Sequence, residues 1–211
     1  MAPQPTFSSL ILKPTERTPR RKPVLDHLGV ITNTVNYLQN KRGWQSVETE
    51  MQLPWVSDMK KHRQADVVAW NRHEREFYLI ECKASWNDFQ RDMKFMECKR
   101  WCTWMAFAVP EELATAARIW MDEHDGPRAF GGVGLLVIPN DYTNRRMVRR
   151  PKRRPMNEQM YGMMVEQWAA SCRSRLVGAR MKITELEYTW KNRNILRDLE
   201  ARRNDAAATA G

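Results

Sequence analysis

Two apolar segments separated by a short polar stretch constrain the fold of this chain more than any other feature. The first covers residues 65–70, the second covers 77–83, and the residues between them are all polar. Strand-forming runs joined by so few polar residues are typical of an antiparallel β-hairpin. We therefore expect two paired strands, with Asp66 near the start of the first and Glu81 near the end of the second.

The flanking sequence predicts an α/β sandwich, in which this hairpin belongs to a central mixed sheet flanked by helices. The periodicity of apolar residues and the positions of Gly and Pro separate the other elements of this core. Helices are expected over residues 24–40, 86–104 and 111–123, and strands over 44–53, 105–109 and 135–138.

Composition divides the chain into four parts. Residues 1–23 form a basic, proline-rich arm, and residues 24–150 form the predicted core. Residues 151–205 are expected to be a helical extension that is broken around Gly178, and 206–211 a disordered tail.

The net charge and the cysteine content limit the classes of protein to which this chain can belong. The net charge of +10 suits a polyanionic partner. No apolar stretch approaches the ~20 residues that span a bilayer, so no membrane partner is expected. The four cysteines form no paired framework. Cys98 and Cys102 are expected to be buried helix residues rather than half of a zinc site. We expect a reducing, cytoplasmic location in a bacterial or phage-infected cell.

The end of the second hairpin strand carries the residues with the clearest chemistry. Alternation along a strand places Glu81 and Lys83 on one face and the Cys82 side chain on the other. The hairpin brings Asp66 to face them. Two converging carboxylates make an oxygen site for Mg²⁺ or Mn²⁺, to which Cys82 would add only its backbone carbonyl. Such a site suits phosphodiester hydrolysis, with Lys83 orienting the water or stabilising charge on the phosphate.

The Glu-x-Lys triplet alone is weak support for this site, because the chain repeats it at Glu97-Cys98-Lys99. The second copy falls in a helical pattern, where residues two apart do not face each other. Only Glu81 and Lys83 combine an apolar strand, a preceding strand with an Asp and a following helix. A salt-bridged hairpin on the surface of an ordinary α/β domain is the alternative interpretation of this pattern.

The ordered series of motifs resembles the PD-(D/E)XK nuclease superfamily, with Ala65 where that pattern usually has proline. The resemblance is greater to its MmcB-like DNA-repair branch and covers roughly residues 24–150. It implies a restriction-endonuclease-like sandwich, a divalent metal held by Asp66 and Glu81, and a catalytic Lys83. The motifs that carry it are Arg63-Gln64-Ala65-Asp66-Val67-Val68-Ala69, Ile80-Glu81-Cys82-Lys83-Ala84-Ser85, Asp88-Phe89, Asp92-Met93-Lys94, Phe107-Ala108-Val109-Pro110 and Gly132-Val133-Gly134-Leu135-Leu136-Val137.

The resemblance leaves a further acidic metal ligand to be placed. Superfamily members often carry a glutamate on the first helix, where this chain has only Asp26. Glu50, on the first predicted strand, stands where the MmcB-like branch carries a glutamate. We prefer Glu50 as the candidate and keep Asp26 as the alternative.

A basic run after the core is a candidate DNA-binding surface, because each phosphate that it neutralised would strengthen binding. The alternative is a solvated linker. Lys94 falls on the helix predicted after the strand of Glu81 and Lys83. It either flanks the DNA or belongs to the polar face of an ordinary amphipathic helix. Trp86 either stacks on a base or packs in the core. The basic run consists of Arg145, Arg146, Arg149, Arg150, Lys152, Arg153 and Arg154.

Three functions remain open from the sequence. The first is a Mg²⁺-dependent DNA endonuclease acting on phage, repair or recombination DNA. The second is a DNA-binding protein of the same fold that cuts little or nothing. The third is a subunit recruited to a DNA-processing machine through residues 156–205. There Ile183, Leu186 and Trp190 form a stripe that suits self-association, a clamp over DNA, or core packing.

Overall fold

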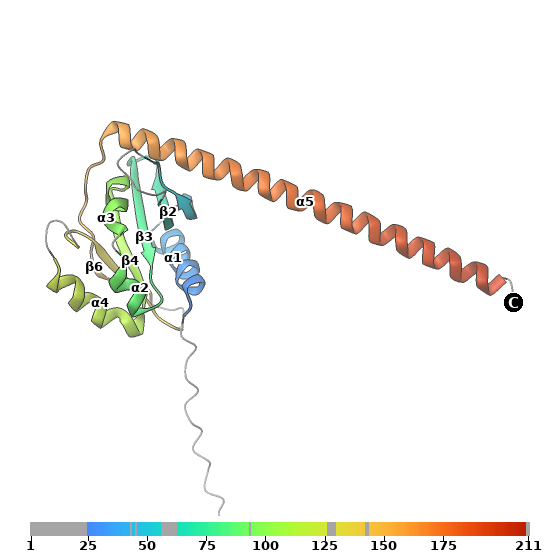
Figure 1. The fold of residues 1–211 in the computed structure, drawn as a ribbon, viewed down its shortest axis with the longest axis horizontal. Helices are drawn as coiled ribbons and strands as arrows, with labels where there is room; N and C mark the ends of the chain where they lie inside the picture. The colour runs from blue at the N-terminus through green and yellow to red at the C-terminus, as the bar shows by residue number, and fades with distance from the viewer. Residues whose placement is uncertain are drawn as a thin grey trace, which may run out of the picture.

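The predicted hairpin lies within a six-stranded mixed sheet of order β1-β2-β3-β4-β5-β6 (Figure 1). This computed structural model describes residues 25–42, 44, 46–55, 63–92, 94–125, 130–141 and 144–209. The proline-rich arm predicted over 1–23 lies outside these residues. The strands are β1 (Ser46–Gln52), β2 (Gln64–Asn71), β3 (Glu76–Cys82), β4 (Trp104–Pro110), β5 (Gly134–Ile138) and β6 (Arg146–Arg149).

The pairing of these strands confirms the hairpin and the mixed sheet. β2 pairs antiparallel with β3, with Val67 opposite Ile80, and antiparallel with β1 on its other side. β3, β4 and β5 are parallel, and β6 returns antiparallel to β5. The hairpin turn forms because the side chain of Asn71 accepts backbone hydrogen bonds from His73 and Glu74, at 3.1 and 3.2 Å.

Helices cover both faces of the sheet, as the sandwich prediction requires (Figure 1). α1 (His27–Arg42) packs on one face, where Val30 and Leu38 are fully buried. α2 (Trp86–Arg91), α3 (Phe95–Cys98) and α4 (Glu111–Glu123) pack on the other. Trp86 belongs to this second core, where it stacks on Phe89 with ring centroids 5.6 Å apart.

The single helix predicted over residues 86–104 was wrong. The segment forms α2, α3 and a 3₁₀ turn (Lys99–Trp101), with an extended residue, Asp92, between the two helices. The carboxylate of Asp92 accepts a hydrogen bond from the backbone N–H of Lys94 at 2.9 Å. Such side-chain bonding to the backbone competes with helix formation, so the helix ends here and restarts. The break places Asp92 and Lys94 next to the end of β3.

The C-terminal extension is one uninterrupted helix, α5 (Glu158–Thr209), so the predicted break at Gly178 was wrong. A glycine inside a helix costs only about 1 kcal/mol relative to alanine, which the surrounding sequence offsets. The first turns belong to the core, because Met164 and Trp168 are buried against it. The rest of α5 projects away from the sheet (Figure 1). The helix continues past the predicted boundary at residue 205. No described helix has the length and apolar character needed to cross a membrane.

Candidate active site

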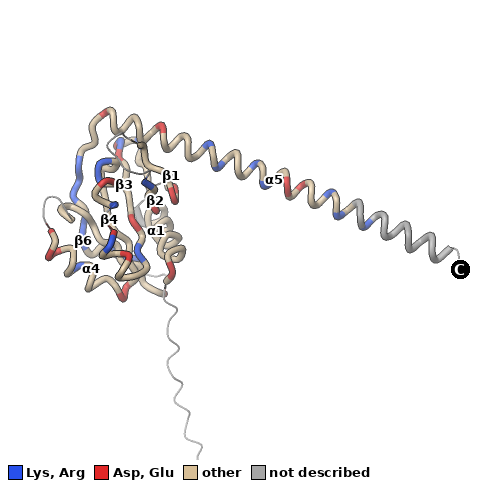
Figure 2. Tube along the Cα trace, in the orientation of Figure 1, with Lys and Arg blue, Asp and Glu red and all other residues tan. Residues whose placement is uncertain are grey.

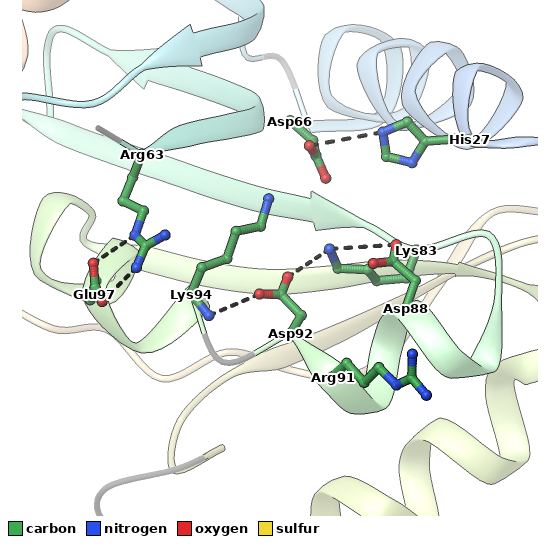
Figure 3. Close-up of a pocket in the computed structure, with 9 residues that line it drawn as sticks. All are labelled: His27, Arg63, Asp66, Lys83, Asp88, Arg91, Asp92, Lys94 and Glu97. Atoms are coloured by element: carbon green, nitrogen blue, oxygen red, sulfur yellow. Dashed lines mark hydrogen bonds and ion pairs between the residues drawn. The ribbon is translucent and has the colours of Figure 1, made fainter. Parts of the chain in front are cut away.

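A hollow of about 610 Å³ lies where β2 and β3 meet the start of α1 and the α2–α3 break. Figure 3 shows the side chains that line it, which are almost all charged. They come from segments far apart in the sequence, so the hollow is a product of the tertiary structure. The lining residues are His27, Arg63, Asp66, Lys83, Asp88, Arg91, Asp92, Lys94 and Glu97.

The strand register brings the two predicted carboxylates together. With Val67 opposite Ile80, Asp66 stands level with Glu81 on the neighbouring strand. The Oδ2 atom of Asp66 accepts a hydrogen bond from the backbone N–H of Cys82 at 2.7 Å, which holds the carboxylate at the end of β3. The Cys82 side chain is buried on the opposite face, against α1, as strand alternation predicts.

Glu81 is fully buried, with an exposed fraction of 0%. Within the described part of the chain, the nearest partner of its carboxylate is the ammonium of Lys94, 3.0 Å from Oε2. Burial, and then repulsion from Asp66, raises the pKa of Glu81 to about 7. A fully buried carboxylate is costly to keep charged unless a cation compensates it.

Lys83 is also buried, directly after β3. Its ammonium lies 2.6 Å from Oδ2 of Asp92, 3.7 Å from Oδ2 of Asp88 and 3.8 Å from Oε2 of Glu81. Burial acts to lower the pKa of Lys83, but the carboxylate of Asp92, and after it that of Glu81, raises the pKa overall. The predicted catalytic lysine is therefore a charged group held by Asp92.

Lys94 reaches the same carboxylate from the start of α3. Its ammonium lies 3.0 Å from Oε2 of Glu81, and a third of its side chain is exposed. Burial acts to lower the pKa of Lys94, while Glu81 and Asp66 raise it above its ordinary value. The sequence suggested Lys94 only as a DNA contact, and the structure places it as a counter-ion inside the site.

Sequence reasoning did not assign roles to several residues that line the hollow, among them Asp92, His27 and Arg63. Asp92 belongs to a motif of the family resemblance but was given no role, although its carboxylate lies 2.6 Å from the ammonium of Lys83 and accepts a hydrogen bond from the backbone N–H of Lys94. His27 lies with Nε2 3.9 Å from Oδ1 of Asp66. Arg63 makes a two-pronged ion pair with Glu97, with hydrogen bonds of 2.6 and 2.8 Å that close one side of the hollow. The His27–Asp66 and Arg63–Glu97 pairs join distant segments, so no local spacing could have revealed them.

The position of Glu50, the candidate third acid, is different. The register of β1 sets its backbone beside that of Asp66, between the Thr49–Val67 and Met51–Ala65 pairs. Its φ of 52° is left-handed, however, and its side chain is exposed. Glu50 lines a second hollow, next to α5, and not the hollow that contains Asp66. Its role as a ligand stays a prediction, as does that of the Cys82 carbonyl.

The chemical type of the donor atoms in the site suits a divalent cation. Asp66 and Glu81 supply the hard oxygen atoms that Mg²⁺ and Mn²⁺ prefer. A cation between them would offset the repulsion that raises the pKa of Glu81. Within the described residues, no group of three or more His, Cys, Asp or Glu side chains is arranged to hold a metal ion. The two carboxylates would thus need backbone or water ligands, and Lys94 competes for one of their oxygens.

The predicted basic run lies away from this hollow. Its middle forms β6, an edge strand that the sequence analysis missed, and β4 and β5 lie between β6 and β3. Figure 2 shows Lys and Arg along the segment that leads from β6 to α5. Several of these side chains are held by the fold, including Arg145 with Asn33, Arg146 with Glu111, Arg149 with Asp122 and Asp125, and Arg153 with Glu76.

Three members of the run have other surroundings. Arg150 and Lys152 are exposed and form no ion pair with a described residue. Arg154 is half-buried, and its backbone N–H donates to the carbonyl of Thr103 at 2.9 Å. Arg150 and Lys152 are therefore the cations of the run that the fold leaves most accessible.

Comparisons with known proteins bear on the family and the fold of this chain. The sequence profile of the MmcB-like family, described as DNA repair protein MmcB-like, matches residues 31–182. Among solved structures, the chain is similar to the SPO1766 protein of unknown function from Silicibacter pomeroyi. That similarity has a TM-score of 0.55 and 22% identity, and covers 74% of this chain and 92% of that chain. At this identity it bears on the fold alone. A search of curated proteins found no match.

Proposed function

This chain belongs to the MmcB-like family of DNA repair proteins, and on that premise we propose that it is a metal-dependent DNA endonuclease. The observation that carries the proposal is the convergence of Asp66 and Glu81 beside two lysines at the end of β3. A binding surface for DNA needs cations alone. A fully buried carboxylate, Glu81, beside the partly buried carboxylate of Asp66 is explained better by a metal that they hold together.

Asp66 and Glu81 hold the metal in this proposal. When bound, the divalent cation polarises the scissile phosphate and lowers the pKa of a water molecule. The hydrogen bond from Cys82 N–H fixes Asp66, and the strand fixes Glu81, so both donors are positioned before substrate arrives.

The lysines supply positive charge where the phosphate becomes more negative. Lys83 keeps its proton because Asp92 lies 2.6 Å away, so it can stabilise charge on the phosphate oxygens without first gaining a proton. Lys94 balances Glu81 and is free to turn toward the phosphate backbone, since part of its side chain reaches solvent. Asp92 does not face the substrate in this scheme and acts as a positioning residue.

The proposal is tested by incubating the full chain with supercoiled, linear, single-stranded and branched DNA in Mg²⁺, Mn²⁺ or EDTA. We expect cutting with a metal and none in EDTA, and a loss of at least a hundredfold for Lys83→Ala or Glu81→Gln. Lys99→Ala is the matched control, because Lys99 belongs to the other Glu-x-Lys triplet and does not line the hollow. If no substrate is cut with either metal, or if Lys83→Ala cuts like the wild type, the enzymatic proposal fails.

A DNA-binding protein that cuts little is the second candidate. The ion pair between Lys94 and Glu81 favours it, because a lysine already compensates the carboxylate that a metal would need. This candidate predicts that Lys83→Ala binds DNA as the wild type does, with a steep dependence on salt, while neither protein cuts.

A further inference from the structure

The part of α5 beyond the core carries a stripe of exposed apolar side chains. Leu176, Ile183, Leu186 and Trp190 are 70%, 57%, 69% and 66% exposed, and Ala179 lies between the first two. We call these five residues the α5 seam. Val177, Met181 and Tyr188 are also exposed, at 60%, 69% and 68%, and lie on the other side of α5, so the seam is distinguished by the sizes and charges of its members. Large apolar side chains grouped on a surface mark an interaction site.

The spacing of the seam indicates what kind of surface covers it. Its members follow one another at alternating intervals of four and three residues, the repeat that places a and d positions of a coiled coil on one face. DNA offers no such partner, since a surface for DNA would be lined with cations. A helix with the same repeat is the natural occupant, and the second copy of this chain supplies one.

We propose that α5 pairs with α5 of a second copy in an antiparallel coiled coil, with the two-fold axis near Thr184 and Glu185. This arrangement sets Ile183 against Leu186 of the partner subunit, and Ala179 against Trp190 of the partner subunit. The largest side chain of the seam then meets the smallest, at both ends of the contact. Leu176 meets the stem of Arg193 of the partner subunit, where the seam ends.

The size pattern excludes a parallel pair. In a parallel coiled coil each residue would face its own copy, so Trp190 would meet a second tryptophan and Ala179 a second alanine. One layer would be overfilled and another left with a gap, and both defects destabilise a packed interface. Parallel alignment would also set Arg175 beside Arg180 of the partner subunit, a like-charge contact, although it would set Lys182 beside Glu187 of the partner subunit, an attraction.

The charges beside the seam favour the antiparallel pair. Arg180 lies on one flank next to Glu187 of the partner subunit, and the two-fold axis repeats this attraction at the other end. On the other flank Lys182 lies next to Thr189 of the partner subunit, so no like charges meet. Such flanking pairs set partner choice and orientation in coiled coils. Most of the seam lies beyond residues 31–182, so the family match does not account for it.

The first test is the mass of the full chain in solution, from low to high micromolar concentration, by sedimentation or light scattering. We expect the mass of two chains for the wild type and of one chain for Ile183→Glu/Leu186→Glu. Met181→Glu is the matched control, because Met181 is 69% exposed but lies on the opposite side of α5. Near-UV circular dichroism checks that the core is intact in each variant.

The second test exchanges the flanking charges. Arg180→Glu alone should weaken dimerisation about tenfold, because two attractions become repulsions, and Arg180→Glu/Glu187→Arg should restore it. The proposal is overturned if the wild type has the mass of one chain at every concentration. It is equally overturned if Met181→Glu dissociates the dimer and the seam variant, Ile183→Glu/Leu186→Glu, does not. It is also overturned if the seam variant keeps its mass and loses DNA binding instead.

Discussion

The ammonium of Lys94 lies 3.0 Å from Oε2 of Glu81, so a lysine just before α3 compensates a fully buried carboxylate on β3. Asp66 stands beside the same carboxylate and Lys83 lies 3.8 Å from it. Glu81 is thus the group on which the charges of the hollow converge, and its ionisation depends on its neighbours.

Lys94→Met should destabilise the protein at pH 8 by roughly 2 kcal/mol, a value reduced from that of a fully buried pair because Lys94 is partly exposed. At pH 5.5 the loss should shrink, because Glu81 then carries a proton and needs no cation. Urea unfolding in EDTA at both pH values measures this. Lys191→Met, at an exposed position on α5, is the control. An equal loss at both pH values would indicate packing rather than charge.

Glu81→Gln should remove a pH dependence of stability. The pKa of Glu81 is raised from 4.5 to about 7, so between these values the folded protein binds a proton that the unfolded chain has released. The free energy of unfolding of the wild type therefore falls as pH rises through this window, by roughly 3 kcal/mol at most. The variant lacks this fall and should be the more stable protein at pH 8 in EDTA. The raised pKa of Glu81 would be contradicted if the free energies of unfolding of wild type and variant differed by the same amount at every pH from 4 to 8.

Asp92→Asn should reduce cleavage at least tenfold while leaving metal affinity nearly unchanged, because Asp92 holds Lys83 rather than the metal. Removing its charge also lowers the pKa of Lys83, so the variant should lose activity at a lower pH than the wild type does. Cleavage rates as a function of pH, with calorimetric titration of Mn²⁺, separate these effects. Asp88→Asn is the matched control, since Asp88 is more exposed and its carboxylate is 3.7 Å from Lys83.

Arg150→Ala/Lys152→Ala should weaken DNA binding and reduce the slope of log affinity against log salt by roughly 2, about one for each lost phosphate contact. Both side chains are exposed and unpaired among the described residues. Arg149→Ala should leave the slope unchanged, because Arg149 is already paired with Asp122 and Asp125. An unchanged slope in the double variant would show that DNA does not contact this segment.

The hairpin and its carboxylates were predictable from the chain alone. Apolar segments on either side of residues 71–76 specify two antiparallel strands, and alternation along them then decides which side chains share a face. That local rule was enough to bring Asp66 level with Glu81 and to send the Cys82 side chain to the other core. It was also enough to reject Glu97 and Lys99, which do lie in helical segments.

Tertiary structure alone decided how these groups are partnered. The packing of α2 and α3 against the hairpin makes Asp92 the partner of Lys83 and brings Lys94 to Glu81. The packing of β1 against the hairpin sets the direction of the Glu50 side chain. The same holds for β6 and for the burial of Met164 and Trp168. The spacing of apolar residues in the sequence shows whether a segment is a strand or a helix, and so which of its side chains share a face. Charge pairs and edge pairing are contacts between elements, and these exist only once the elements have packed.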